Sequence, residues 1–450
     1  MSVLGALDAG VSGMDAQAAA LSAISNNVAN SQTVGYKETD TSFVDYVTQS
    51  TATSQAPGSV VALPQYMNSL AGTPTQVSNP TSLAVSGAGF FPVQLPVGTT
   101  GAGAATFSPE QYYTQAGDFS LNNAGYLQNS EGYVLDGFPA ANAAGTAFNT
   151  NTLQPIQVSE APSPPVATST VSVSGNLGAT PPAGTTSYSS TVQIYDPAGN
   201  QQNLSLNWSQ VTAAGPVSAT NPITAANPAI PNEWALTATS GASTTGPMIV
   251  TFGSTPATAG TITGITGPAG TVPTAQASGD AATVNLTLPF GTGTQNIALN
   301  LGQFGSTNGI TQFAGTTYAQ SSAPVQNGSP QGNYAGVTVQ SSGAVVINYT
   351  NGATQTIAQV PLANFADPNA LQQQSGQAFT ATTASGVANV VTAGTGGTGT
   401  LVAGSVEGSN VDIATQFTQM IVAQQAYTAN SKVITTANSM LQVAVNMIQG

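Results

Sequence analysis

The distribution of glycine and proline divides this chain into two ends and a middle. The first proline is Pro57, and residues 409–449 contain neither proline nor glycine. Between these ends, Gly, Pro, Thr and Ser punctuate short runs of alternating apolar and polar residues. Because proline and glycine interrupt helices and mark turns, the contrast predicts helical ends around a β-rich middle. The predicted fold class is therefore α+β.

Apolar residues near the N-terminus recur at alternating spacings of three and four, which is the heptad pattern of a coiled coil. The positions of this N-terminal seam are Leu4, Leu7, Val11, Met14, Ala18, Leu21 and Val28. Asn26, Asn27 and Asn30 then predict the end of the helix. Glycines inside it each cost about 1 kcal/mol relative to alanine, and isolated helices are marginal in water. We therefore expect neighbouring copies to order this end of the chain.

The C-terminus repeats the heptad pattern over a longer stretch. The positions of this C-terminal seam are Ile413, Phe417, Met420, Gln424, Tyr427, Ser431, Ile434, Asn438, Leu441, Val445 and Ile448. Ser409 and Asp412 predict a capping box, and a helix over 412–448 would be about 55 Å long. Seams at both ends favour a coiled-coil pairing of the termini over helices packed separately on their own domains. The polar members of the seam either face solvent or fix its register.

Local turn signals predict hairpins in the middle of the chain. Asn351-Gly352 lies between apolar runs at 344–350 and 353–360, a strong hairpin signal. Similar turns at 196–200 and 122–125 predict hairpins between 191–195 and 202–208 and between 119–121 and 126–128. Loops are predicted at 212–231 and 254–279, although the latter can hide short strands. The run 392–400 predicts a flexible connector ahead of the last helix.

Charge and residue content exclude many functions. Charged residues make up 4% of the 450 residues, and two cations, Lys37 and Lys432, face sixteen carboxylates for a formal charge of −14. Nucleic-acid binding needs several cations and is not expected. Cysteine and histidine are absent, which excludes disulfides, thiolate or imidazole metal sites and Ser–His–Asp catalysis. We predict no catalytic, cofactor-binding or metal-binding residue.

Paired carboxylates are the one catalytic arrangement left, as in glycoside hydrolysis. The candidate carboxylates are isolated in sequence and lie in or beside predicted turns; they are Asp118, Glu131, Asp136 and Asp196. Their usual role in stabilising turns is enough to explain their presence there. A surface-layer protein or adhesin of stacked β domains is a third alternative, but it needs no heptads at its ends. The pattern therefore favours a non-enzymatic structural subunit that assembles with copies of itself.

Several blocks resemble the flagellar axial family of rod and hook proteins. The blocks shared by rod and hook subunits are SNNVAN at 25–30, TVGYK at 33–37, LAVSG at 83–87, YTQAGDF at 113–119, EGSNVD at 407–412 and MIVAQQAY at 420–427. The blocks similar to the hook branch are VQIYD at 192–196, ITQFA at 310–314 and VPLANFADP at 360–368. A distal-rod-type protein, the alternative within the family, would be shorter and lack the outer domain. The family usually places a basic residue where Gln425 stands.

The resemblance implies three domains. Residues 1–70 and 405–450 would form a terminal helical core, 71–160 and 316–404 an inner β domain, and 161–315 an outer β domain inserted in the inner one. The family signature would comprise Asn26, Asn27, Asn30, Gly35 and Tyr36, and we favour an assembly role for it over a turn alone. The two seams would become buried between copies.

The resemblance also implies function and partners. Subunits would form a curved hollow tube that joins rod to filament and transmits torque. The expected partners are further copies, the distal rod protein, the hook cap protein, the hook–filament junction protein and the flagellar type III export apparatus, with no nucleic acid and no small-molecule substrate. The chain lacks a basic N-terminal start and any apolar run of about 18 residues, so export without a cleaved signal peptide is expected. Its location would be extracellular, in the hook and basal body.

Overall fold

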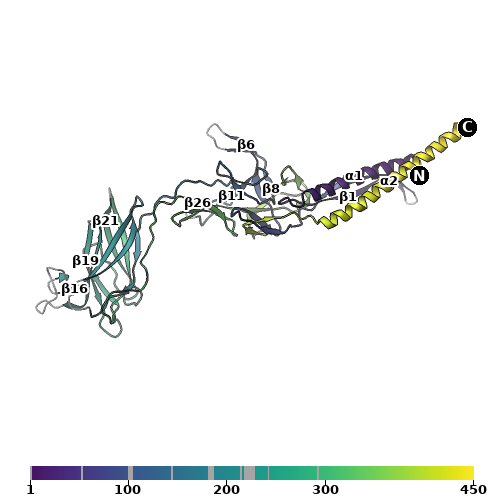
Figure 1. Cartoon of the computed structure of the whole chain (residues 1–450). Helices are drawn as coiled ribbons and strands as arrows, with labels where there is room; N and C mark the ends of the chain where they lie inside the picture. The colour runs from purple at the N-terminus through teal and green to yellow at the C-terminus, as the bar shows by residue number, and fades with distance from the viewer. Residues whose placement is uncertain are drawn as a thin grey trace. The chain divides into compact units, whose positions relative to one another are not determined.

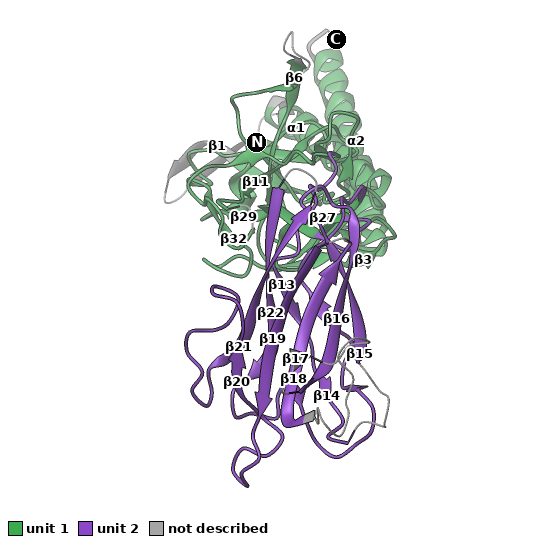
Figure 2. Ribbon diagram, turned by 90° about the vertical axis from the view of Figure 1, so that its left-hand side faces the viewer, with its two compact units in different colours: residues 1–160, 335–348, 354–450 green, residues 161–334, 349–353 purple. Residues whose placement is uncertain are grey.

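The chain folds into two compact units. The computed structural model describes residues 3–51, 54–99, 105–142, 145–180, 187–212, 215–216, 229–241, 243–290 and 293–449. Unit 1 comprises Met1–Glu160, Ala335–Asn348 and Thr354–Gly450, and unit 2 comprises Ala161–Tyr334 and Tyr349–Ala353 (Figure 2). Two terminal helices and many strands make the chain α+β, as predicted. Among the described residues, neither helix has an 18-residue stretch apolar enough to cross a membrane.

The two terminal helices belong to unit 1 and lie side by side (Figure 1). They are α1 (Val3–Ala29) and α2 (Ile413–Gln449). Gly10 of α1 lies against Ile434, Gly13 against Asn430, and Asn27 against Gln416, so the helices run antiparallel. The predicted C-terminal helix therefore exists and pairs with the N-terminal one.

The start of α2 differs from the predicted capping box. Asp412 itself caps the helix, because its Oδ1 accepts hydrogen bonds from the backbone N–H groups of Ala414 (2.9 Å) and Thr415 (3.4 Å). The Ser409 hydroxyl instead accepts from the N–H of Val411, at 3.3 Å. The capping-box prediction was wrong because residues 408–412 are not helical and lead from a strand to the helix.

A long antiparallel hairpin packs beside α1. It consists of β1 (Thr39–Thr51) and β2 (Ser54–Tyr66), paired from Thr39 with Tyr66. The N–H of Val60 in β2 donates to the Ser12 hydroxyl of α1, at 3.3 Å. The hairpin therefore covers one side of α1.

The rest of unit 1 is β structure. Its main sheet has eleven strands, of which eight follow the order β26-β27-β28-β11-β5-β8-β31-β30 while β9, β10 and β12 pair at the side. In chain order these strands are β5 (Phe91–Gln94), β8 (Tyr112–Thr114), β9 (Ser120–Leu121), β10 (Leu127–Gln128), β11 (Val134–Pro139), β12 (Gln154–Pro155), β26 (Tyr334–Val339), β27 (Ala344–Tyr349), β28 (Thr354–Gln359), β30 (Gln372–Gln373) and β31 (Ala378–Thr380).

In the described part of unit 1 there are four further strand pairs, three of which connect distant parts of the sequence. They are β3 (Pro74–Gln76) with β34 (Ser405–Glu407), β4 (Leu83–Ser86) with β33 (Thr400–Ala403), β29 (Pro361–Asn364) with β32 (Asn389–Thr392), and β6 (Pro96–Thr99) with β7 (Ala105–Phe107). A short 3-10 helix, Pro368–Ala370, follows β29. Phe90, Phe365 and Phe379 meet edge to face in the core. Pairs β3–β34 and β4–β33 tie the approach to α2 to the segment that follows the hairpin.

The described residues of unit 2 form three antiparallel or mixed sheets around an apolar core. The largest contains β15 (Tyr188–Tyr195), β16 (Gln201–Thr212), β17 (Gly215–Pro216), β18 (Ala229–Ser240), β19 (Ser243–Phe252) and β20 (Ile262–Thr266). The others contain β21 (Ala281–Phe290), β22 (Gly293–Gln303), β13 (Thr170–Ser172) and β25 (Val325–Gln326), and β23 (Ile310–Thr311), β14 (Gly175–Asn176) and β24 (Ala319–Gln320). Alternate residues of β21 are buried, as a strand with one core face requires. Trp208 and Trp234 both lie in this core.

The three predicted hairpins are confirmed, and one loop prediction was wrong. β27–β28, β15–β16 and β9–β10 pair around the predicted turns. Residues 392–400 form a hydrogen-bonded turn between β32 and β33, with Gly394 N–H donating to the Gly399 carbonyl (2.8 Å), and not a connector to α2.

Of the other predicted loops, 212–231 lies mostly outside the described residues, and 254–279 contains β20. The predicted outer boundary lay at 315, whereas β24 and β25 pair with β14 and β13 of unit 2.

Candidate assembly site

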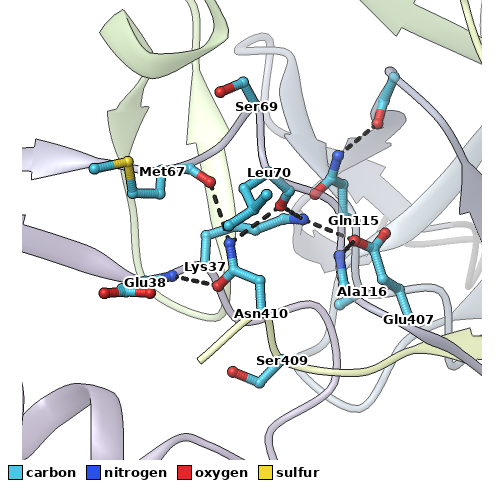
Figure 3. A network of polar contacts seen from close by, with 12 residues as sticks. Lys37, Glu38, Met67, Ser69, Leu70, Gln115, Ala116, Glu407, Ser409 and Asn410 are labelled. Carbon is cyan, nitrogen blue, oxygen red and sulfur yellow. Dashed lines mark hydrogen bonds and ion pairs between the residues drawn. The ribbon is translucent and has the colours of Figure 1, made fainter. Parts of the chain in front are cut away.

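A buried ion pair joins the segment after α1 to the strand before α2. Lys37 Nζ lies 2.7 Å from Glu407 Oε1, with side chains only 2% and 1% exposed (Figure 3). Lys37 also donates to the Leu70 carbonyl at 2.8 Å, and Glu407 Oε1 accepts from the N–H of Gly72 at 2.6 Å. Burial lowers the pKa of Lys37, and the Glu407 carboxylate opposes that shift. The pair therefore holds three parts of the chain at one point.

Asn410 adds a second set of contacts beside this pair. Its Oδ1 accepts from the Glu38 N–H at 2.7 Å, and its Nδ2 donates to the carbonyls of Met67 (3.2 Å) and Leu70 (3.1 Å) (Figure 3). The segment before α2 is thereby fastened to both ends of the β1–β2 hairpin.

Asn27 is the centre of the predicted signature. Its Oδ1 accepts from the Tyr36 hydroxyl (3.0 Å) and the Thr39 N–H (3.1 Å). Its Nδ2 donates to the Thr39 carbonyl (2.9 Å) and to Gln416 Oε1 (3.0 Å). Gln416 Nε2 donates in turn to Glu38 Oε1 at 2.7 Å. Because Asn27, Tyr36 and Gln416 are buried, this network fixes the end of α1 to the start of α2.

The other signature residues shape the turn that follows α1. Asn30 Nδ2 donates to the Asn26 carbonyl (2.9 Å), and its Oδ1 accepts from the Thr33 hydroxyl (3.1 Å). Gly35 has a φ of 69°, and a Cβ there would lie 2.5 Å from the Ala116 nitrogen. Glycine is therefore required both by conformation and by space. Asn26 is exposed and takes part through its carbonyl alone.

The structure buries only part of the two predicted seams. In α1, Leu7, Met14, Leu21 and Val28 are half-buried, and Val11 and Ala18 are exposed. In α2, Met420, Ser431, Ile434 and Leu441 are half-buried, and Ile413, Phe417, Gln424, Tyr427, Asn438 and Val445 are exposed. The side chains of Leu4 and Ile448 lie outside the described part. Small residues make the closest approach between the helices, at Gly10 and Gly13.

Large apolar side chains remain exposed along α2. They include Ile413, Phe417, Ile421, Val422, Val433, Met440, Val443, Val445 and Met447. A groove of about 310 Å³ lies between α1, α2 and the hairpin, lined by Ala20, Ile24, Phe43, Val422 and Ala426 among others. Exposed apolar surface of this extent marks an interaction site.

The structure gives no support for carboxylate chemistry. Asp196 Oδ1 accepts from the N–H groups of Ala198 (2.9 Å) and Asn200 (2.8 Å), so it stabilises its own turn. Asp136 is buried in β11, where burial raises its pKa to about 7 against hydrogen bonds from Gln111 and Gln94. Among the described residues, no three His, Cys, Asp or Glu side chains gather as a metal ion would require.

Four family models match the chain. They are "Flagella basal body rod protein" at 7–37, "Flagellar hook protein FlgE/F/G D1 domain" at 84–179, "Flagellar basal body protein FlaE D2 domain" at 167–329 and "Flagellar basal body rod FlgEFG protein C-terminal" at 402–447. The flagellar hook protein FlgE of Brucella suis is 34% identical over 452 residues, covering 99% of this chain and 100% of the relative. The chain belongs to the flagellar hook protein family.

Other hook proteins match with similar coverage. FlgE of Rhizobium meliloti is 31% identical over 99% of this chain and 100% of its own length, and FlgE of Salmonella typhimurium is 29% identical over 97% and 98%. A crystal structure of Helicobacter pylori hook protein FlgE2 aligns with a TM-score of 0.45 and 12% identity over 73% of this chain and 98% of its own. The predicted resemblance is confirmed by the sequence relatives, and the chain is a structural hook subunit rather than an enzyme, a distal rod protein or an adhesin.

The two regions that match the rod-protein models contain the contacts described above. The match at 7–37 takes in most of α1, the signature and Lys37, and the match at 402–447 takes in Glu407, Asn410 and most of α2. Sequence reasoning placed Asn27, Gly35 and Tyr36 correctly within a family block but assigned no role to Lys37, Glu407 or Gln416. One signal was present, because Lys37 is one of only two cations in the whole chain.

Proposed function

We propose that this hook subunit polymerises with copies of itself into a curved hollow tube that joins rod to filament and transmits torque as a universal joint. The observation that carries the proposal is the row of large apolar side chains exposed on α2, with Phe417 51%, Val443 58% and Met447 78% exposed. Full burial of a fully exposed side chain of this kind contributes about 1.5–3 kcal/mol, and more than half of each of these side chains is still exposed. In a family of hook proteins, neighbouring subunits are the natural source of that burial.

The predicted seams supply the contacts between copies. The exposed members of the C-terminal seam lie on α2 beside half-buried members, of which Ile434 packs against Gly10 of α1. Helices of a second copy would cover the exposed members, so that each helix pair contributes one layer to a larger bundle.

The signature serves assembly by holding the helix pair on the β body. Asn27, Tyr36 and Gln416 fix the two helices to each other, while Lys37 and Glu407 fix both to the strands. A rigid joint at this point would pass force from the helices to the β domains.

We also propose three domains. Residues 1–70 and 405–450 form the helical core, 71–160 and 316–404 the inner β domain, and 161–315 the inserted outer domain. The pairing of β24 and β25 with strands of unit 2 favours moving the outer boundary from 315 to 334. Replacing residues 161–334 with a flexible linker should leave a folded remainder in calorimetry. Loss of the unfolding transition would refute the insertion.

The proposed partners follow from the same role. They are further copies, the distal rod protein, the hook cap protein, the hook–filament junction protein and the flagellar type III export apparatus. Subunits would leave the cell without a cleaved signal peptide and act in the extracellular hook. The low charge of the β domains would suit subunits that slide against one another, because exposed ion pairs would be few.

Deletion of the helices tests the assembly proposal. The fragment 31–408 keeps Lys37 and Glu407 but lacks α1 and α2. We expect a β-rich monomer by circular dichroism that forms no tubes in electron microscopy. Tubes of normal appearance from this fragment would refute the proposal.

A matched pair of full-length variants makes the test finer. Val443→Ser on α2 and Val325→Ser in unit 2 remove side chains of similar exposure, 58% and 67%. We expect the first to slow polymerisation measured by light scattering and the second to leave it unchanged. Equal behaviour of the two would count against α2 as the contact surface.

A further inference from the structure

The two helices carry very few charges. Their only charged side chains are Asp8 and Asp15 in α1 and Lys432 in α2. Lys432 is also the one exposed cation of the chain, because the other, Lys37, is buried against Glu407. Any ion pair formed purely between helices must therefore join Lys432 to Asp8 or Asp15.

This pair is not formed inside the subunit. Within the described residues, Lys37–Glu407 is the ion pair present, and Asp8, Asp15 and Lys432 are all exposed. Helix geometry gives the reason. At about 100° per residue, Lys432 lies about 200° around α2 from Asn430 and from Ile434, which face α1.

The α1 carboxylates are turned away in the same manner. Asp15 lies about 200° from Gly13, and Asp8 about 200° from Gly10, and those two glycines face α2. The antiparallel pairing therefore places the cation and the carboxylates on opposite outer faces of the helix pair. If the partner of Lys432 is a carboxylate on a helix, that helix must be α1 of another copy.

The positions of the two carboxylates suit an interhelical contact. They are seven residues apart, so they share one face of α1 about 10 Å apart along its axis. With the seam positions as a and d, both occupy e, where charges form salt bridges between helices and set partner and register. Side chains three and four residues from Asp15 and Lys432 are small or β-branched, which permits close approach; they are Val11, Ser12, Ala18 and Ala19, and Thr428, Ala429, Thr435 and Thr436.

We propose that Lys432 of one subunit pairs with Asp15 or Asp8 of α1 in a neighbouring subunit and sets the register of the helical layer. The inference deepens the proposed self-assembly and depends on it. The partner is a second copy of this chain. Lys432, the one exposed cation, would recognise Asp8 or Asp15 of that copy, which lie seven residues apart on one face of α1.

Two variants with the same net charge isolate the contact. Lys432→Gln and Gln201→Glu each lower the net charge of the full chain by one, the second at an exposed position of unit 2. Exposed ion pairs are worth up to a factor of about five in an equilibrium constant. We expect Lys432→Gln to raise the critical concentration for polymerisation about two- to five-fold over Gln201→Glu. Equal critical concentrations would refute the ion pair while leaving self-assembly intact.

Charge reversal then identifies the partner. Lys432→Glu should raise the critical concentration further, and adding Asp15→Lys or Asp8→Lys should restore it, with circular dichroism checking that each variant folds. Rescue by either substitution supports the proposal and names the residue. Failure of both would mean that Lys432 meets a different group, which overturns the proposal. If the wild-type chain forms no polymer at all, the proposed function is itself wrong, and the ion pair with it.

Discussion

Glu407 neutralises a lysine that is otherwise enclosed by protein. Breaking a buried pair by removing one partner typically costs about 3–5 kcal/mol, because the other charge is left uncompensated. We predict that Glu407→Gln lowers the unfolding free energy of unit 1 by that order. Glu160→Gln makes the same change of net charge at an exposed position of unit 1 and should have little effect.

The sequence offers unusually specific probes for this measurement. Both tryptophans, Trp208 and Trp234, lie in unit 2, so tryptophan emission reports unfolding of that unit alone. Trypsin can cut only after Lys37 and Lys432, since there are no other Lys or Arg residues. Glu407→Gln should speed cleavage after Lys37 and leave the tryptophan transition unchanged. Unaltered cleavage after Lys37 would show that the pair does not hold this segment.

Asp136 should make the stability of unit 1 depend on pH. Its pKa is about 7 in the fold, against an ordinary value of 3.8, because burial favours the neutral acid. A raised pKa means that the folded state binds the proton of Asp136 more tightly than the unfolded state does. The protonated carboxyl therefore contributes its full stabilisation below about pH 4, and this stabilisation is lost as pH rises through about 7. The loss is at most about 4 kcal/mol.

Asp136→Asn tests this assignment, because Asn resembles the neutral acid and can still accept from Gln111. Between pH 4 and 7 the unfolding free energy of wild-type unit 1, measured by circular dichroism in urea, should fall more steeply than that of the variant. Parallel pH profiles would show that Asp136 does not control the dependence.

The signature illustrates what single residues reveal in sequence. The alternative considered for the signature was a turn alone, and the positive φ of Gly35 shows that it does contain a turn. The hydrogen bond that Asn27 donates to Gln416 was not predictable, because it joins residues 389 positions apart. The role of Lys37 depends in the same way on a partner at the far end of the chain.

At the scale of elements, glycines decide how closely α1 and α2 approach. A Cβ at Gly10 would lie 2.9 Å from Ile434 Cγ1, so a larger residue must push the Ile434 side chain of α2 aside. We predict that Gly10→Val loosens the helix pair by about 1–3 kcal/mol, although valine has the higher helix propensity. Faster hydrogen exchange of α1 amides and lower ellipticity at 222 nm would record the loss.

Ala19→Val is the matched control on the exposed side of α1. It inserts the same side chain and lowers helix propensity, yet should change exchange less than Gly10→Val. The reverse order would mean that intrinsic propensity, and not contact with α2, governs α1.

Elements formed by neighbouring residues were the most predictable. Asn351-Gly352 and its flanking runs contain all the information for β27–β28, and the hairpin formed as predicted. Heptad spacing predicted both terminal helices but not their contact face, because Gly10 and Gly13 carry no apolar signal. Residues 392–400 looked like a linker by composition, but β33 pairs with β4, which lies far earlier in the chain, and this pairing makes them a turn.

At the scale of the whole molecule, charge opposes assembly while the apolar surface of α2 favours it. Each subunit carries a formal charge of −14, and Lys37 is already neutralised inside unit 1. Bringing copies together therefore brings carboxylates together, with Lys432 as the one exposed cation to offset them. Apolar burial depends little on moderate salt, whereas repulsion between exposed charges is screened within about 8 Å at physiological ionic strength.

These terms predict how conditions change polymerisation. Added salt should accelerate polymerisation. Screening weakens the repulsion between many carboxylates, whereas the attraction that it weakens comes only from the few contacts of Lys432. Lowering the pH from 7 towards about 4.5 should accelerate it again, as carboxylates with ordinary pKa values of about 3.9–4.3 begin to take up protons. Sulfate should act most strongly, since it also strengthens apolar burial. Light scattering of purified monomer across a grid of salt and pH measures all three effects. Slower polymerisation at higher salt would mean that attractive ion pairs outweigh repulsion, and that Lys432 contributes more than its single charge suggests.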